Sequence, residues 1–126
     1  MLFTISFDLK GSDPSVYSDI YCWVHANDGY KYVLLETGLW GRLPDSCVVM
    51  PYNTEDQIIA AQEFAINVYS EFGYECEYVC ATKGEPSGYS QVQSPPRYAL
   101  NRIEAIQSHQ IKKTAKLVGK AIFGKQ

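Results

Sequence analysis

An aspartate near the end of the N-terminal segment is the residue whose type and position could most directly do chemistry. Residues 2–9 alternate between apolar and polar side chains, and Asp8 stands near their end, ahead of Gly11. Such alternation is typical of a half-buried strand. A carboxylate there can project from the sheet. Two copies in a dimer could hold Mg²⁺, which prefers carboxylate oxygens and keeps water that can serve hydrolysis. We therefore expect Asp8 to be the catalytic and metal-binding residue; the alternative is a hydrogen bond in the following turn.

Basic residues lie in two places. Lys10 and Arg42 flank the region where Asp8 should emerge, so they are candidate nucleic-acid contacts to phosphate; the alternatives are a solvated lysine and an arginine paired with a carboxylate. A basic stripe near the C-terminus is a further candidate for binding nucleic acid, or for docking on an acidic surface. The stripe consists of Lys112, Lys113, Lys116 and Lys120.

The net charge of −3 conceals a division of the chain. Residues 1–90 carry thirteen Asp and Glu against four Lys and Arg, a net −9, whereas residues 91–126 carry one Glu against seven Lys and Arg, a net +6. An acidic body binds phosphate poorly but can attract a basic partner protein. Leu39 and Trp40, in a loop predicted over residues 38–45, are the candidate partner contacts, because buried tryptophans often anchor interfaces. The indole could instead stack on a base, or fold back to seal the sheet edge.

Cysteine and histidine spacing argues against zinc. The four cysteines form no C-x-x-C pair, and both histidines stand far from any cysteine pair. Cys76 and Cys80 lie four apart in a predicted strand, where they should point to the same face. Reduced, mostly buried thiols are the simpler interpretation. His25, near the end of a predicted helix, is a possible general base without a visible partner.

Four strands and two helices must position these residues. Strand patterns cover residues 2–9, 32–37, 47–50 and 76–82, and helical patterns cover about 14–26 and 54–72, the second beginning with a capping box at Thr54. The order βαββαβ predicts an α+β, ferredoxin-like domain with a four-stranded antiparallel sheet and both helices on one face. The other face, with Thr4, Ser6 and Asp8, would be bare, so a homodimer is expected.

A change in composition predicts the domain organisation. We expect a ferredoxin-like domain over residues 1–83, a Gly-, Pro- and Ser-rich linker over 84–97 and a basic C-terminal helix, separable from the body, over 98–126. No apolar run approaches the length of a membrane-spanning helix, and the N-terminus lacks a charged leader region. The sequence therefore predicts a cytoplasmic protein with no membrane contact.

The run FTISFDLKG, a strand pattern that ends in Ser6-Phe7-Asp8, resembles the opening of small CRISPR-associated ferredoxin-like nucleases and of VapD-type toxins. Tyr17-Ser18 early in the first helix and Gly41-Arg42-Leu43 before the third strand make the wider pattern most similar to GhoS-type antitoxin endoribonucleases. The resemblance covers about residues 2–82. It implies a ferredoxin-like dimer from a group that includes nucleases acting on RNA or DNA.

Two functions compete. The first is a small metal-dependent endoribonuclease of a toxin–antitoxin or defence system, with Asp8 of two protomers holding Mg²⁺. The second is a non-catalytic antitoxin or inhibitor that binds a partner protein through its acidic surface and the Leu39–Trp40 loop. The strand-end aspartate favours the first and the acidity favours the second.

Overall fold

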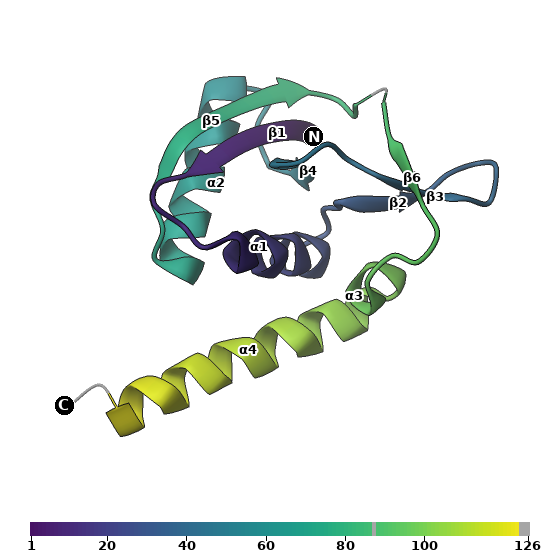
Figure 1. Ribbon diagram of the computed structural model, residues 1–126. Coiled ribbons are helices and arrows are strands. Elements are labelled where there is room, and N and C mark those ends of the chain that lie inside the picture. The colour runs from purple at the N-terminus through teal and green to yellow at the C-terminus, as the bar shows by residue number, and fades with distance from the viewer. Residues whose placement is uncertain (87, 124–126) are drawn as a thin grey trace.

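The computed structural model describes residues 1–86 and 88–123 and, within 112–123, the side chain of Thr114 alone. The chain folds into mixed α and β structure with two three-stranded antiparallel sheets (Figure 1). The strands are β1 (Leu2–Leu9), β2 (Tyr32–Leu34), β3 (Trp40–Arg42), β4 (Cys47–Pro51), β5 (Cys76–Lys83) and β6 (Ser90–Val92). The helices are α1 (Pro14–Ala26), α2 (Gln57–Phe72), α3 (Arg97–Leu100) and α4 (Arg102–Phe123).

The first sheet has the order β4-β1-β5, and the core lies between it and helices α1 and α2. Alternation along β1 sends Phe3, Ile5 and Phe7 into this core, where each is almost fully buried. Phe7 packs against Phe64 of α2, with ring centroids 4.8 Å apart. The other face is bare, as predicted, and Ser6 and Asp8 are exposed on it.

Side chains at the helix ends explain where α1 and α2 begin. Asp13 caps α1 by accepting a hydrogen bond from the Ser15 amide. The predicted start of α2 at Thr54 is wrong: Asp56 is the cap, because its carboxylate accepts from the first amides of a helix that begins at Gln57. Thr54 instead accepts from the Asp56 amide and shapes the preceding turn.

The single four-stranded sheet is the main correction to the predicted fold. Just before the predicted second strand, Tyr30 makes one bridge to Val49 of the first sheet, and the chain then turns away. Residues Tyr32–Leu34 pair with Trp40–Arg42, which pair in turn with Ser90–Val92 in the second sheet. The reason is the turn over residues 35–39, which closes with the Leu35 amide donating to the Leu39 carbonyl at 2.8 Å. Gly38 adopts φ +84°, a left-handed conformation that suits glycine.

A β-bulge in β5 corrects the predicted orientation of two cysteines. Asp8 lies opposite Tyr78 but Leu9 lies opposite Cys76, so Glu77 is an extra residue. The extra residue reverses the alternation, so Cys76 packs against the core while Cys80 is exposed. None of the four cysteines, all in the described part of the chain, forms a disulfide.

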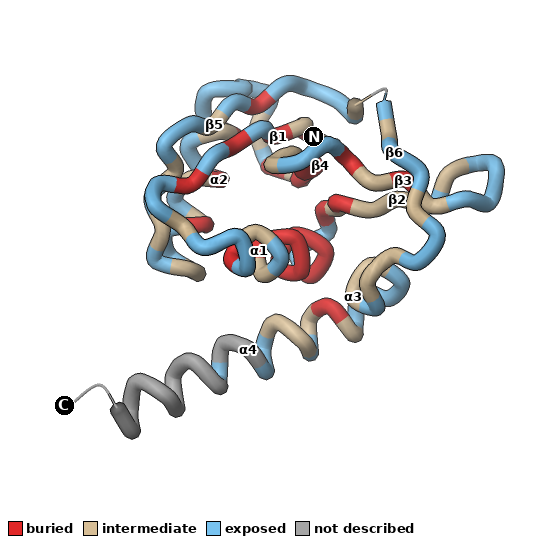
Figure 2. The backbone as a smooth tube through the Cα atoms, in the orientation of Figure 1, coloured by how far each residue is buried: buried red, intermediate tan, exposed pale blue. Residues whose placement is uncertain are grey.

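The segment after the predicted linker contacts the body along the beginning of α4. Ala105 is fully buried, and its carbonyl accepts from the Cys22 thiol of α1 at 3.7 Å. Arg102 pairs with Asp28 at 2.9 Å, and His109 lies 3.2 Å from the carboxylate of Glu71. Figure 2 shows this buried contact in the first turns of α4. Among the described residues, no helix is both long and apolar enough to cross a membrane.

Candidate functional site

The β2–β3 hairpin projects from the body (Figure 1) and carries exposed apolar side chains. Trp40 is paired with Leu34 on one side and Val92 on the other, so the three form a row across the second sheet. Leu34 is 57% exposed and Leu39, in the turn, is 47% exposed, whereas Trp40 and Val92 are half-buried. We call Leu34, Leu39, Trp40 and Val92 the hairpin patch; Leu39 directly precedes Trp40 in the turn, so it lies next to the row and is not a member of it. An exposed aliphatic pair beside a tryptophan is a common feature of protein-binding surfaces.

A buried histidine holds the base of the hairpin. The amides of Lys31 and Tyr32 donate to Nε2 of His25 at 3.0 and 3.3 Å. Burial lowers the pKa of His25 to about 4, so the ring is neutral near pH 7 and can accept these bonds. The ring also lies 5.5 Å from that of Tyr98, which covers it. His25 therefore acts as a structural acceptor, and the possible general-base role finds no support in this geometry.

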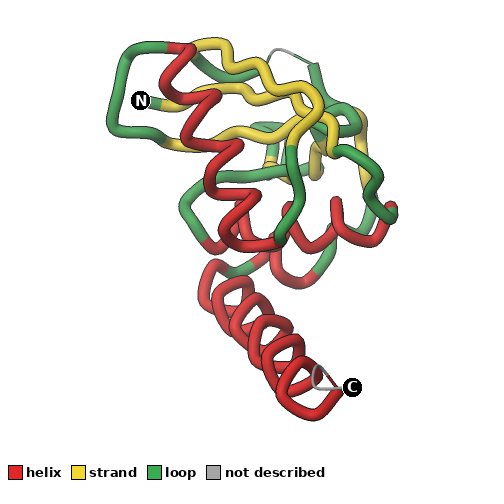
Figure 3. Tube along the Cα trace, turned by 90° about the vertical axis from the view of Figure 1, so that its left-hand side faces the viewer, coloured by secondary structure: helices red, strands yellow, loops and turns green. Residues whose placement is uncertain are grey.

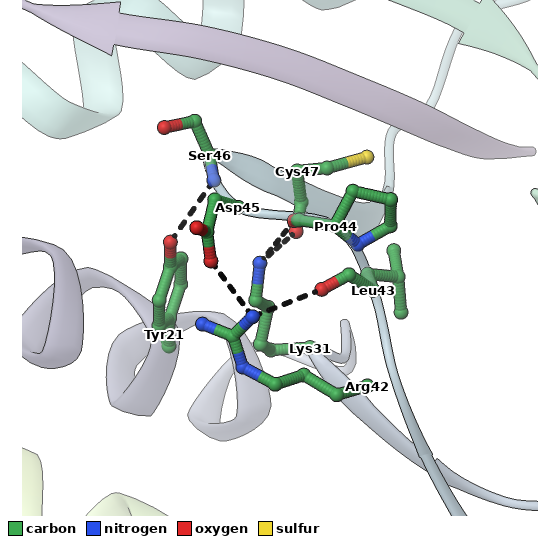
Figure 4. A network of polar contacts seen from close by, with 8 residues as sticks. All are labelled: Tyr21, Lys31, Arg42, Leu43, Pro44, Asp45, Ser46 and Cys47. Atoms are coloured by element: carbon green, nitrogen blue, oxygen red, sulfur yellow. Dashed lines mark hydrogen bonds and ion pairs between the residues drawn. The ribbon is translucent and has the colours of Figure 1, made fainter. Parts of the chain in front are cut away.

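A fully buried lysine ties the hairpin to the segment that leads into β4 (Figure 4). The Lys31 ammonium donates to the carbonyls of Pro44 and Cys47 and lies 4.3 Å from the centre of the Tyr21 ring. Burial, aided by the positive charge of Arg42, lowers the pKa of Lys31 to about 8. Carbonyl acceptors and an aromatic face compensate a buried ammonium group only in a fixed geometry. The hairpin base is therefore a rigid support.

Arg42 lies on the rim of the same network and is already paired. Its guanidinium donates to Asp45 at 2.8 Å, and the Asp45 side chain is 87% exposed. The Asp45 carboxylate balances the charge of Arg42. An open pocket of about 400 Å³ adjoins the pair, and hydroxyl groups line much of it. Its lining includes Tyr17, Ser18, Tyr21, Tyr32, Arg42 and Ser46.

The predicted phosphate-binding residues lie on different elements of the structure. Lys10 is exposed just after β1, in the first sheet, whereas Arg42 belongs to the second sheet. The predicted stripe lies within α4, and the side chains of Lys112, Lys113, Lys116 and Lys120 are outside the described residues.

Asp8 is exposed on the bare face of the first sheet, beside the β-bulge. Tyr78 lies opposite it. The pKa of Tyr78 is raised, chiefly by a side-chain hydrogen bond with Cys80 and then by the charge of the Cys80 thiolate. The charge of Asp8 has the smallest effect. In the part of the chain that the structure describes, no three His, Cys, Asp or Glu side chains gather as a possible metal site. A metal held at Asp8 by one protomer alone would thus have fewer than three His, Cys, Asp or Glu ligands among the described residues.

Sequence reasoning found part of this site. It selected Leu39 and Trp40, but it placed residue 34 in the interior of a longer strand and treated Lys31 only as one of the few basic residues. The hairpin turn that exposes Leu34 has one sequence signal, Gly38, which suits a left-handed turn.

Comparison with known proteins adds no family to this description. No family model, curated protein or solved structure matches the chain. The resemblance to small ferredoxin-like nucleases stays a prediction.

Proposed function

We propose that this chain is a non-catalytic protein-binding module, of the antitoxin or inhibitor kind, that docks a partner protein on the hairpin patch. The observation that carries this proposal is the exposure of Leu34 and Leu39 on a hairpin whose base is held by Lys31 and His25. A pre-organised apolar patch loses little conformational freedom on binding, which favours affinity.

The charge of the body indicates the chemistry of the partner. Residues 1–90 carry a net −9, and Glu36 is exposed within the hairpin turn itself. The partner that fits this surface has an apolar groove bordered by Lys or Arg. Opposite charges would speed the encounter, so the association rate should fall as salt rises.

A paired substitution tests the patch. We expect immobilised wild-type protein to retain a partner from a lysate of the encoding organism, and the Leu34→Ser, Leu39→Ser variant to retain at least about tenfold less, because apolar anchors dominate interface energy. Ile103→Ser is the matched control, since Ile103 is 64% exposed on α4. Quantitative mass spectrometry of the retained proteins gives the ratio. Equal recovery by the wild type and the hairpin variant would contradict the proposal.

A metal-dependent endoribonuclease is the second candidate, favoured by the exposure of Asp8 on a bare sheet face next to a bulge. Bulges often occur beside active sites, where they re-orient a side chain. In that function Asp8 of two protomers would hold Mg²⁺ and contact RNA, with Lys10 positioning phosphate.

Cleavage assays separate the two candidates. We expect purified protein to leave mixed RNA and DNA substrates intact with Mg²⁺ or Mn²⁺. Three results together would establish the nuclease instead: the wild type cleaves, Asp8→Asn abolishes cleavage at an unchanged melting temperature, and the charge-matched control Glu36→Gln still cleaves. The exchange keeps the side-chain shape and removes the charge that would hold the ion.

A further inference from the structure

Strand β5 is a long edge strand with an unpaired side. All of its eight residues except the bulged Glu77 pair with β1, and no strand of the described residues covers its outer edge. The Gly84 amide donates to the Leu2 carbonyl, so by antiparallel alternation Tyr78, Cys80 and Thr82 bond to β1. The amides and carbonyls of Val79 and Ala81 therefore point outward, and the outward amide of Lys83 donates to the Gln57 side chain. Such an edge can accept another strand.

Helix α2 borders this edge with an exposed apolar stripe. Ile58 is 71% exposed, Ile66 63% and Tyr69 59%. The Lys83 amide donates to the Gln57 side chain at 3.0 Å, which places the start of α2 beside the end of β5. At the other end, Ile66 and Tyr69 line a shallow pocket together with Cys76. Figure 3 shows α2 running across the strands of the first sheet. Edge and stripe thus form one continuous surface.

The sequence of β5 is complementary to itself in the antiparallel direction. When Cys80 of one copy lies opposite Cys80 of another, Val79 faces Ala81 and Tyr78 faces Thr82. Val79 and Ala81, whose backbone groups point outward, then meet as hydrogen-bonded pairs. Beyond them, Glu77 of each copy lies opposite Lys83 of the other, so each end of the pairing has one pair of opposite charges.

We propose that a second copy of this chain covers this surface. The β5 strands of two protomers pair antiparallel about Cys80. This pairing joins the first sheet of one protomer to the first sheet of the other, giving a single six-stranded sheet. The two-fold axis is perpendicular to the sheet, so the two α2 stripes lie on the same side and approach each other. This inference is independent of the hairpin patch, which belongs to the other sheet.

The arrangement has a consequence for Asp8. From strand spacing and rise per residue, the two Asp8 positions in this dimer are roughly 20 Å apart. A single metal ion cannot bridge carboxylates at that separation. The β5 dimer is therefore distinct from a face-to-face dimer in which two Asp8 side chains share Mg²⁺.

Solution mass and a backbone substitution test the interface. We expect light scattering of the full chain at tens of micromolar to give twice the 14.2 kDa chain mass. Val79→Pro should give the monomer mass with unchanged circular dichroism, because it removes an outward amide and leaves the β1 ladder intact. Val79→Thr keeps that amide and should stay dimeric. Ile66→Lys with Tyr69→Lys provides a second disruption through exposed positions, in case the proline variant fails to fold.

Cross-linking tests the register. In a non-hydrogen-bonded antiparallel pair the Cα atoms lie about 4.5 Å apart, within reach of a disulfide. Diamide, which accepts two electrons and two protons from a thiol pair, should therefore link Cys80 to Cys80. In a Cys80→Ser background, Tyr78→Cys mixed with Thr82→Cys should cross-link, whereas Thr82→Cys alone should not. A monomeric wild type, or a dimer that survives both the proline and the lysine substitutions, would overturn the proposal.

Discussion

Replacing Gly29 by alanine is expected to destabilise the protein by about 3 kcal/mol, because the new Cβ has no room at the junction of the two sheets. It would overlap the Val49 carbonyl oxygen and lie 2.6 Å from the Met50 sulfur. That carbonyl cannot move freely, since it accepts from the Tyr30 amide in the bridge that joins the sheets. Urea unfolding monitored by circular dichroism measures the loss.

Gly88→Ala is the matched control for this substitution. A Cβ at Gly88 meets no atom within 4 Å, so the variant should unfold within about 0.5 kcal/mol of the wild type. If Gly29→Ala were as stable as Gly88→Ala, the close approach of the two sheets at Val49 would be wrong.

Ending the chain after Ser94 is expected to lower the free energy of unfolding by about 3 kcal/mol, since re-exposing one or two buried side chains costs that much. The truncation removes Tyr98 and Ala105, which cover His25 and Cys22 of α1. Differential scanning calorimetry should show a melting temperature lower by about 10–20 °C.

A chain that ends after Ile111 is the control for the truncation. It keeps Ala105 and the His109–Glu71 pair, so it should melt within a few degrees of the full chain. A 1–94 fragment that melts like the full chain would show instead that the C-terminal helix is separable, as its composition predicts.

Periodic patterns predicted the first sheet and its two helices well. Alternation along residues 2–9 identified Phe3, Ile5 and Phe7 as core residues and left Asp8 on the bare face, and the structure confirms both. The predicted end of the second helical pattern at residue 72 is confirmed, and Gly73 follows it with φ +76°. These features depend on local spacing and on backbone conformation, which a single sequence records directly.

Features that depend on distant residues were missed. Residues 32–37 have the composition of one strand, but only Tyr32–Leu34 pair, with Trp40–Arg42, and the chain then turns at residues 35–39. Lys31 becomes buried because the carbonyls of Pro44 and Cys47 surround it, and no local pattern indicates this contact. The polar Gly- and Pro-rich segment predicted a spacer, whereas the burial of Ala105 depends on its packing against α1.

The equilibrium constant between this chain and its captured partner tests the central claim most directly. We predict that isothermal titration calorimetry gives a dissociation constant at least about tenfold higher for the Leu34→Ser, Leu39→Ser variant than for wild type. This ratio corresponds to a loss of roughly 1.4 kcal/mol or more of binding free energy. The Ile103→Ser control should bind like wild type. Equal dissociation constants for the wild type and the hairpin variant would contradict docking on the hairpin patch.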